Sequence, residues 1–365
     1  MLEKITESLK GTVGGAVLLI ASFPVLFNNE GCAVDIAKGL EEGASIVQTI
    51  DATKDIASYN GKLIHTSGEA VAGAKLNDPE FGIDEKALVL ERDTEIYQWE
   101  ESVSEDDSKK PSKTYTYSKK WAWKHIDSSK FNDPKGHFNP PQQFEPKTFR
   151  PDSVSLGKLK FSEELIGSIP ANKDLSYDQS TTNRIKSKFG SKAQIQDGTI
   201  YVGKNPADPE VGDMKITHKY AMEGTSSIIG LLNGDSVNSY RTKRDTTILM
   251  FDFGTKDAKS MFQDAQDANV TRTWMVRFLG VFMMFLGFRL IFGPIAAVGG
   301  MIPILGTILD LGVSLVAGIL TISFSLVTIA VAWIFFRPIL GITLLVIGIG
   351  AFGYLYYKKN HLKTT

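Results

Sequence analysis

The chain has 365 residues, of which 43% are hydrophobic, and its 40 Lys and Arg nearly balance its 41 Asp and Glu at a net charge of −1. Nine of the basic and three of the acidic residues lie outside residues 28–271, so that segment carries a net charge of −7. Phosphate binding draws on net positive surface, which argues against nucleic acid as a partner of this segment. The single cysteine, Cys32, excludes an internal disulfide and a site of several thiolates.

Residues 11–27 form the first apolar segment, which carries no charged side chain. A helix needs about 20 apolar residues to cross the roughly 30 Å hydrocarbon core of a bilayer. Backbone groups in lipid must satisfy their own hydrogen bonds, so the segment is expected to be helical. The sequence therefore predicts a first membrane span here, preceded by a short N-terminal tail, residues 1–10.

Residues 28–271 are polar and predict a β-rich α+β domain. Lys86–Trp99 is rich in Leu, Val, Ile and Tyr, which favours a strand paired with Thr114–His125 in a long hairpin. Asp197-Gly198 and Asn233-Gly234 are each flanked by β-type residues, a pattern typical of tight hairpin turns. Further elements are expected as strands at Gly61–Ser67, Met214–Ala221, Ser226–Leu232 and Thr246–Phe253, and as an amphipathic helix at Lys256–Ala268.

Three more membrane spans are predicted near the C-terminus, at residues 272–292, 311–336 and 338–357. Two prolines and four glycines in residues 293–310 exclude one straight helix through that segment, and a connector or interfacial helix is favoured over a re-entrant segment. The predicted fold class is an α-helical multi-pass membrane anchor, with one N-terminal and three C-terminal spans. A large β-rich α+β soluble domain is inserted between spans 1 and 2.

Several polar side chains of the helical segments are expected at headgroup depth or between helices. Arg277 and Arg289 lie near the ends of a span, so their charged heads can reach the headgroups. The full set is Arg277, Arg289, Asp310, Arg337, Lys358 and Lys359. Both short terminal flanks, residues 1–10 and the C-terminal tail 358–365, are basic. The positive-inside rule then places both termini in the cytoplasm and residues 28–271 outside the cytoplasm or in a lumen.

No motif for catalysis, a cofactor or a metal stands out. The glycines at 348, 350 and 353 match the spacing of a dinucleotide fingerprint, but they lie inside a predicted span with no strand before them, so helix packing is favoured. The five histidines show no ligand spacing, and we expect no cofactor and no metal. Trp99, Trp121 and Trp123 are large enough to anchor either a core or a partner surface, and the core is favoured.

A series of short motifs in this order resembles the LUMA family, also called transmembrane protein 43, over residues 11–357. The motifs are Asn29-Glu30-Gly31, Leu76-Asn77-Asp78-Pro79 with Phe81-Gly82, Glu95-Ile96-Tyr97-Gln98-Trp99-Glu100, Gly136-His137 with Asn139-Pro140, Pro209-Glu210-Val211-Gly212-Asp213, and Ala332-Trp333-Ile334-Phe335 with Phe336-Arg337-Pro338.

The resemblance implies a multi-pass protein whose large loop faces the lumen, and it supplies no catalytic residues. Animal members are expected in the endoplasmic reticulum and inner nuclear membrane, where they self-associate and organise envelope proteins. Prokaryotic members are expected in the cell membrane. The ten-residue N-terminal tail, and Cys32 where a basic residue is expected, depart from the animal pattern and favour a microbial member.

Topology and resemblance together predict a non-enzymatic membrane scaffold. Its partners would be membrane lipids, other copies of the chain and other membrane proteins. One alternative is a transporter or channel component that uses Arg289, Asp310 and residues 293–306. A lesser alternative is a membrane-tethered hydrolase that uses His137 with Asp133.

Overall fold

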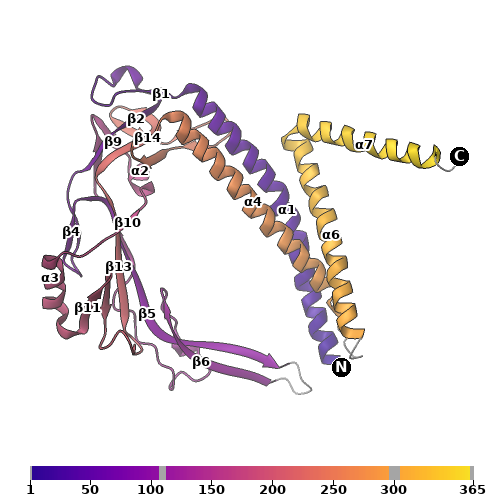
Figure 1. The fold of residues 1–365 in the computed structure, drawn as a ribbon, viewed down its shortest axis with the longest axis horizontal. Coiled ribbons are helices and arrows are strands. Elements are labelled where there is room, and N and C mark those ends of the chain that lie inside the picture. Colours follow the sequence, from indigo (N-terminus) through magenta and orange to yellow (C-terminus); the bar gives the residue numbers. More distant parts are fainter. Residues whose placement is uncertain (1, 107–111, 296–304, 362–365) are drawn as a thin grey trace. The chain divides into compact units, whose positions relative to one another are not determined.

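The computed structural model describes residues 2–106, 112–295 and 305–361. These residues form two compact units (Figure 1). The helical unit consists of the residues up to Ser45, Arg241–Thr246 and the residues from Phe262 onward. The β-rich unit consists of Ile46–Tyr240 and Thr247–Met261.

Four long helices make up most of the helical unit: α1 (Leu2–Ile46), α4 (Ala258–Ile291), α6 (Leu305–Phe336) and α7 (Pro338–His361). Among the described residues, three helices are long and apolar enough to cross a membrane, within Gly11–Ile46, Ala258–Ile291 and Leu311–Phe336. The apolar stretch Pro338–Ile347 of α7 is shorter, so a fourth span stays a prediction. A membrane anchor and a β-rich insertion between its first two candidate spans are thus present.

The helices run further than the apolar segments that predicted them. Helix α1 continues beyond residue 27 to Ile46, and α4 joins the predicted Lys256–Ala268 helix to the second span without a break. Residues 28–45 and 262–271 therefore belong to the helical unit rather than to the inserted domain. Within the predicted connector, residues 296–304 lie outside the described part, and α6 already begins at Leu305.

Helices α1 and α4 lie side by side in the helical unit (Figure 1) and approach each other closely at glycines. A Cβ on Gly287 would lie 2.9 Å from the backbone nitrogen of Leu19 and 3.0 Å from the carbonyl oxygen of Gly15. Small residues at such crossings let helix backbones pack directly on each other in a bilayer. The buried side chains nearby are Leu26, Met284, Phe288 and Ala317.

Replacing Gly287 with alanine should destabilise the helical unit by about 1–3 kcal/mol, since the added methyl group overpacks a backbone contact. The matched control is Gly318→Ala in α6, where a Cβ has no described atom within 4 Å. This control should be neutral or stabilising, because alanine is the better helix former by about 1 kcal/mol. Thermal unfolding of both purified variants in detergent, followed by circular dichroism, checks the difference. Equal midpoints would contradict close packing at Gly287.

The first sheet of the β-rich unit has seven strands in the order β1-β2-β8-β9-β15-β14-β18. Pairing of β2 with β14 closes β2, β8, β9, β15 and β14 into a ring. The strands are β1 (Gln48–Thr49), β2 (Leu63–Ala72), β8 (Val154–Leu156), β9 (Leu159–Phe161), β14 (Gly224–Asn233), β15 (Ser236–Asn238) and β18 (Met250–Phe253). Ile64, Leu156 and Ile228 lie in its core, which helix α2 (Glu163–Ser168) also lines through Leu165.

The second sheet is ordered β11-β12-β13-β5-β6, with β10 added on β13 and β7 on β5. Its strands are β5 (Ala87–Asp106), β6 (Ser112–Ala122), β7 (Lys147–Phe149), β10 (Lys173–Asp174), β11 (Ala193–Gln196), β12 (Thr199–Val202) and β13 (Met214–Met222). A second core, which includes Phe81, Ile96 and Ile216, covers one face together with α3 (Gln179–Phe189). The remaining strands are β3 (Leu76–Asp78), β4 (Ile83–Glu85), β16 (Tyr240–Arg241) and β17 (Thr247–Ile248).

The long hairpin is confirmed, since β5 and β6 pair from Ile96–Ala122 to Asp106–Ser112. The turn at Asp197-Gly198 is also confirmed, and both residues have the positive φ, 49° and 73°, that this turn type requires. The other tight turn is displaced by one residue, because Asn233 still pairs with Ser236 and the loop is Gly234-Asp235. The predicted strand at residues 246–253 is interrupted at Leu249.

Candidate functional site

A carboxylate, a guanidinium and an indole meet between the helices of the helical unit. Glu30 of α1 is fully buried, and its two oxygens accept hydrogen bonds from Arg277 Nε at 2.6 Å and Nη2 at 2.8 Å. Trp333 of α6 donates its indole N–H to Glu30 Oε2 at 2.8 Å. The Arg277 guanidinium also lies 4.7 Å from the ring centroid of Trp274. Both Glu30 oxygens are thus matched by donors, as a carboxylate withdrawn from water requires.

Further polar contacts continue along the same α1–α4 seam. Asn269 donates to the carbonyl oxygen of Ala33 at 2.9 Å, and Gln266 donates to that of Ala37 at 2.9 Å. The donors Gln266 and Asn269 are three residues apart in α4, and the acceptors Ala33 and Ala37 are four residues apart in α1. Residues at these spacings lie on one face of a helix, so the two hydrogen bonds join the facing surfaces of α1 and α4. The seam is thus polar at its membrane-distal end and glycine-rich within the apolar segments.

Arg277 and Arg289, the two arginines of α4 expected at headgroup depth or between helices, have different partners. Arg277 reaches inward to Glu30, with 14% of its side chain exposed, instead of extending to the headgroups. Arg289 donates a hydrogen bond to the Ser314 hydroxyl of α6. Arg337 lies half-buried between α6 and α7. Asp310, Lys358 and Lys359 lie in α6 and α7, and their side chains fall outside the described part of the chain.

Removing one partner of the cluster should be more damaging than removing both charges. Glu30→Gln leaves the buried Arg277 guanidinium without its counter-ion and should cost about 3–5 kcal/mol of stability. The double variant Glu30→Gln, Arg277→Met removes the unpaired charge and should recover much of that loss. Thermal unfolding of the three proteins in detergent measures the coupling. A double variant whose loss equals the sum of the single losses would contradict a direct ion pair.

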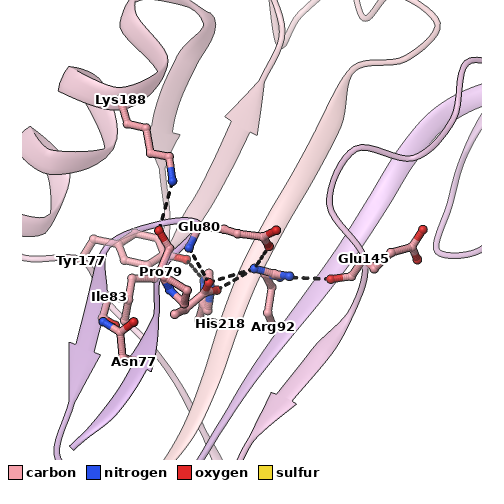
Figure 2. Close-up of polar contacts among 10 residues, drawn as sticks. Asn77, Pro79, Glu80, Ile83, Arg92, Glu145, Tyr177, Lys188 and His218 are labelled. Atoms are coloured by element: carbon pink, nitrogen blue, oxygen red, sulfur yellow. Dashed lines mark hydrogen bonds and ion pairs between the residues drawn. The ribbon is translucent and has the colours of Figure 1, made fainter.

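The β-rich unit contains a second buried polar network, in which Arg92 and His218 contact Asp78. Figure 2 shows Arg92, His218 and Tyr177 of this network. Arg92 of β5 donates to both Asp78 oxygens at 2.9 and 3.0 Å, and His218 of β13 lies with Nε2 2.9 Å from Oδ2. Tyr177 O–H lies 2.9 Å from His218 Nδ1. Arg92 also donates through Nε to the carbonyl oxygen of Glu145 at 3.1 Å. Asp78 ends strand β3, so the network joins one turn to the inner face of the second sheet.

Burial and hydrogen bonding set the charges in this network. Burial alone would raise the pKa of Asp78, but the hydrogen bond from His218 and the charge of Arg92 outweigh it and hold the pKa below its ordinary value. Burial lowers the pKa of His218, against the opposing effect of Asp78. Burial likewise raises the pKa of Tyr177. A neutral His218 that donates to Asp78 and accepts from Tyr177 satisfies all three groups.

The network should make the β-rich unit less stable in mild acid. His218 has a lower pKa in the folded than in the unfolded chain, so its contribution is present above the unfolded value of about 6.5 and is lost as the pH falls below it. Because the pKa of Asp78 is lower in the folded chain, its protonation at still lower pH removes a further part of the folding stability. The unfolding midpoint should therefore fall between pH 7 and pH 5, and less steeply in His218→Gln. Equal slopes in the two proteins would contradict this.

The outer face of the second sheet carries a groove of about 1150 Å³. Lys215 pairs with Glu95 and Thr217 with Asp93 across β13 and β5, so these side chains share one face. Trp121 lies beneath the Lys215 ammonium, which is 4.2 Å from its ring centroid. The lining of this outer-face groove is Asp93, Thr94, Glu95, Trp121, Trp123, Lys124, Pro146, Thr199, Lys215 and Thr217.

Trp99, Trp121 and Trp123 all lie outside the two cores of the β-rich unit. Trp123 is 81% exposed at the groove, and Trp121 is half-buried beside it. Trp99 is half-buried elsewhere, with its ring 4.7 Å from that of His137. These positions favour a surface role for Trp121 and Trp123 over the core role expected from their size.

The pair considered for hydrolysis occupies a packed loop. His137 stacks on Tyr117 at 3.6 Å between centroids, and its Nδ1 lies 3.1 Å from the backbone oxygen of Asp133. Asp133 Oδ1 accepts from the amide of Gly136. His137 Nδ1 also lies 3.4 Å from Asp133 Oδ2, so the structure brings the two residues together within one turn. In the described residues, no group of three or more His, Cys, Asp or Glu is placed to hold a metal ion.

The residues that pair with the predicted ones carry different sequence signals. Glu30 belongs to the Asn29-Glu30-Gly31 motif and is an acidic residue just after an apolar span, but nothing local indicates its partner. Arg92 and His218 have a clearer signal. Arg92 falls on the same alternating positions of β5 as the buried Leu88, Leu90 and Ile96. His218 falls on the same alternating positions of β13 as the buried Met214 and Ile216. A charged residue at a core position of a strand predicts a buried partner.

The comparisons with known proteins identify one family of membrane proteins. The model of the transmembrane protein 43 family matches residues 96–338. The chain belongs to this family. The rat member (Rattus norvegicus) is 30% identical over 358 residues, covering 93% of this chain and 87% of the relative. The human member (Homo sapiens) is 29% identical over 357 residues with the same coverage. The homologue of transmembrane protein 43 from Drosophila melanogaster is 29% identical over 377 residues, 98% of both chains. No solved structure gives a significant match.

Membership in the transmembrane protein 43 family confirms the resemblance seen in the sequence, and the chain is an integral membrane protein. The relatives named above are animal proteins, and a microbial source stays a prediction. The transmembrane protein 43 model begins at Ile96 in β5 and ends at Pro338, so it includes Arg277, Trp333 and His218.

Proposed function

We propose that this chain is a non-enzymatic membrane scaffold that self-associates and binds other membrane proteins through its β-rich unit. The observation that carries the proposal is the outer-face groove, in which Trp123 is 81% exposed. Large exposed aromatic side chains beside paired charges are typical of protein-binding surfaces, where tryptophan provides much of the binding energy.

The charges of the groove fit an extended peptide segment with mixed charge. Asp93 and Glu95 supply negative charge, and Lys124 and Lys215 supply positive charge, along a sheet whose outer face is open. The helical anchor would confine this surface to the vicinity of the membrane, which raises the local concentration of membrane-bound partners. Two cytoplasmic termini and a lumenal or extracytoplasmic β-rich unit complete the proposed arrangement.

Proximity labelling from the β-rich unit tests partner binding in cells. A labelling enzyme inserted at residues 107–111 should mark a defined set of membrane proteins, and Trp123→Ala should reduce that labelling several-fold. Phe138→Ala is the matched control, because Phe138 is an exposed aromatic residue, 65% accessible, outside the groove. An unchanged set in Trp123→Ala, or an equal loss in Phe138→Ala, would contradict binding at the groove.

Photobleaching of single reconstituted proteins tests self-association, with multiple bleaching steps expected for each particle. A protein that stays strictly monomeric would contradict the scaffold. Orientation is measured separately in a Cys32→Ser background. A cysteine at the exposed Ser118 should react with a membrane-impermeant maleimide only from the side opposite to a C-terminal tag.

A further inference from the structure

We propose that the helical unit binds one anionic glycerophospholipid in a groove where α7 begins. This α7 groove has a volume of about 600 Å³ and is lined by Lys38, Phe336, Arg337, Pro338, Ile339, Leu340 and Thr343. Two cationic side chains border a surface that is otherwise largely hydrocarbon. An anionic phospholipid is complementary to this surface, since its acidic headgroup would face the two cations and its acyl chains would face the apolar side chains.

The two cations are available to an anion. Among the described residues, neither the Lys38 ammonium nor the Arg337 guanidinium takes part in a hydrogen bond or an ion pair. Two carboxylates of α1 have other partners. Glu30 is held by Arg277 and Trp333, with the charge of Arg337 adding a longer-range attraction, and Asp35, one turn before Lys38, lies 3.3 Å from Arg244. Neither carboxylate forms an ion pair with Lys38 or Arg337.

Arg337 lies at the end of an apolar candidate span, and Lys38 of α1 borders the same groove. Arg337 lies at the break between α6 and α7, where the apolar candidate span Leu311–Phe336 ends. Lys38 lies roughly 16 Å along α1 from Phe27, at 1.5 Å per residue. Helical side chains lean toward the N-terminus, so the lysine reaches back toward the bilayer. An arginine guanidinium binds phosphate oxygens through two parallel hydrogen bonds, and the lysine adds a point charge.

A lipid suits the apolar part of the groove better than a second copy of the chain. Ile339 is 85% exposed and Leu340 is 43% exposed, and both lie on the first turn of α7 beside the cations. In a bilayer these side chains meet acyl chains at high concentration. The first amide groups of α7 also carry partial positive charge toward the same place, which favours an anion over a zwitterionic headgroup.

Spin-labelled lipids can measure the preference with the full-length protein in phosphatidylcholine nanodiscs. Labelled phosphatidylglycerol should associate more strongly than labelled phosphatidylcholine. Each of Lys38→Gln and Arg337→Gln should reduce that preference about fivefold, the effect of one basic residue near an anionic surface. Arg337→Lys should retain most of it. Thr343→Trp, which fills the apolar part and keeps both charges, should also reduce it.

Lys243→Gln is the matched control, because it removes an exposed charge of the same unit outside the groove. It should leave the preference unchanged. The proposal is overturned by an unaltered preference in the double variant Lys38→Gln, Arg337→Gln, if that variant retains its thermal unfolding midpoint. It is also overturned by an equal loss in Lys243→Gln, by displacement of the lipid with soluble glycerol phosphate, or by a cross-link that places a second copy in the groove.

Discussion

A carboxylate with no exposure to water, that of Glu30, lies among three helices of a membrane anchor and must be matched from two of them. Arg277 of α4 supplies the charge and Trp333 of α6 supplies a further donor. An unmatched charge in such surroundings is far more costly than a lost apolar contact. Any packing of α1, α4 and α6 must therefore keep these three residues together, and this requirement selects one arrangement from the many that apolar helices allow.

The glycines of the seam act with the ion pair rather than independently of it. Close approach at Gly15 and Gly287 brings the α1 and α4 backbones together within the apolar segments. The polar contacts at Asn269 and Gln266 then hold the two helices in the same alignment beyond them. Apolar side chains alone specify such an alignment weakly, because lipid is as apolar as the helix surface.

Much of the architecture could be predicted from local sequence, and its limits have physical causes. Apolar segments predicted the candidate spans, and the β-type residues of Lys86–Trp99 predicted the hairpin. The spacing early in Val34–Ile50 indicates a helix, but its unbroken continuation from the first span could not be predicted, since a helix outside lipid need not be apolar. The closed ring of strands depends on the pairing of β2 with β14, whose residues are more than 150 positions apart. Glu30 and Arg277 are separated by 247 positions, and no local pattern links them.

The buried network of Asp78 also fixes the register of β5 against β13 in the second sheet. Side chains of β5 alternate between the inner face, with Arg92 and Ile96, and the outer face, with Asp93 and Glu95. A slip of one residue against β13 would carry Arg92 to solvent and place Asp93 beside Asp78 in the interior. Two carboxylates would then share a buried site without a cation. The ion pair between Asp78 and Arg92 thus excludes a shift of β5 against β13 by any odd number of residues. β5 is also the strand that carries Asp93 and Glu95 of the outer-face groove.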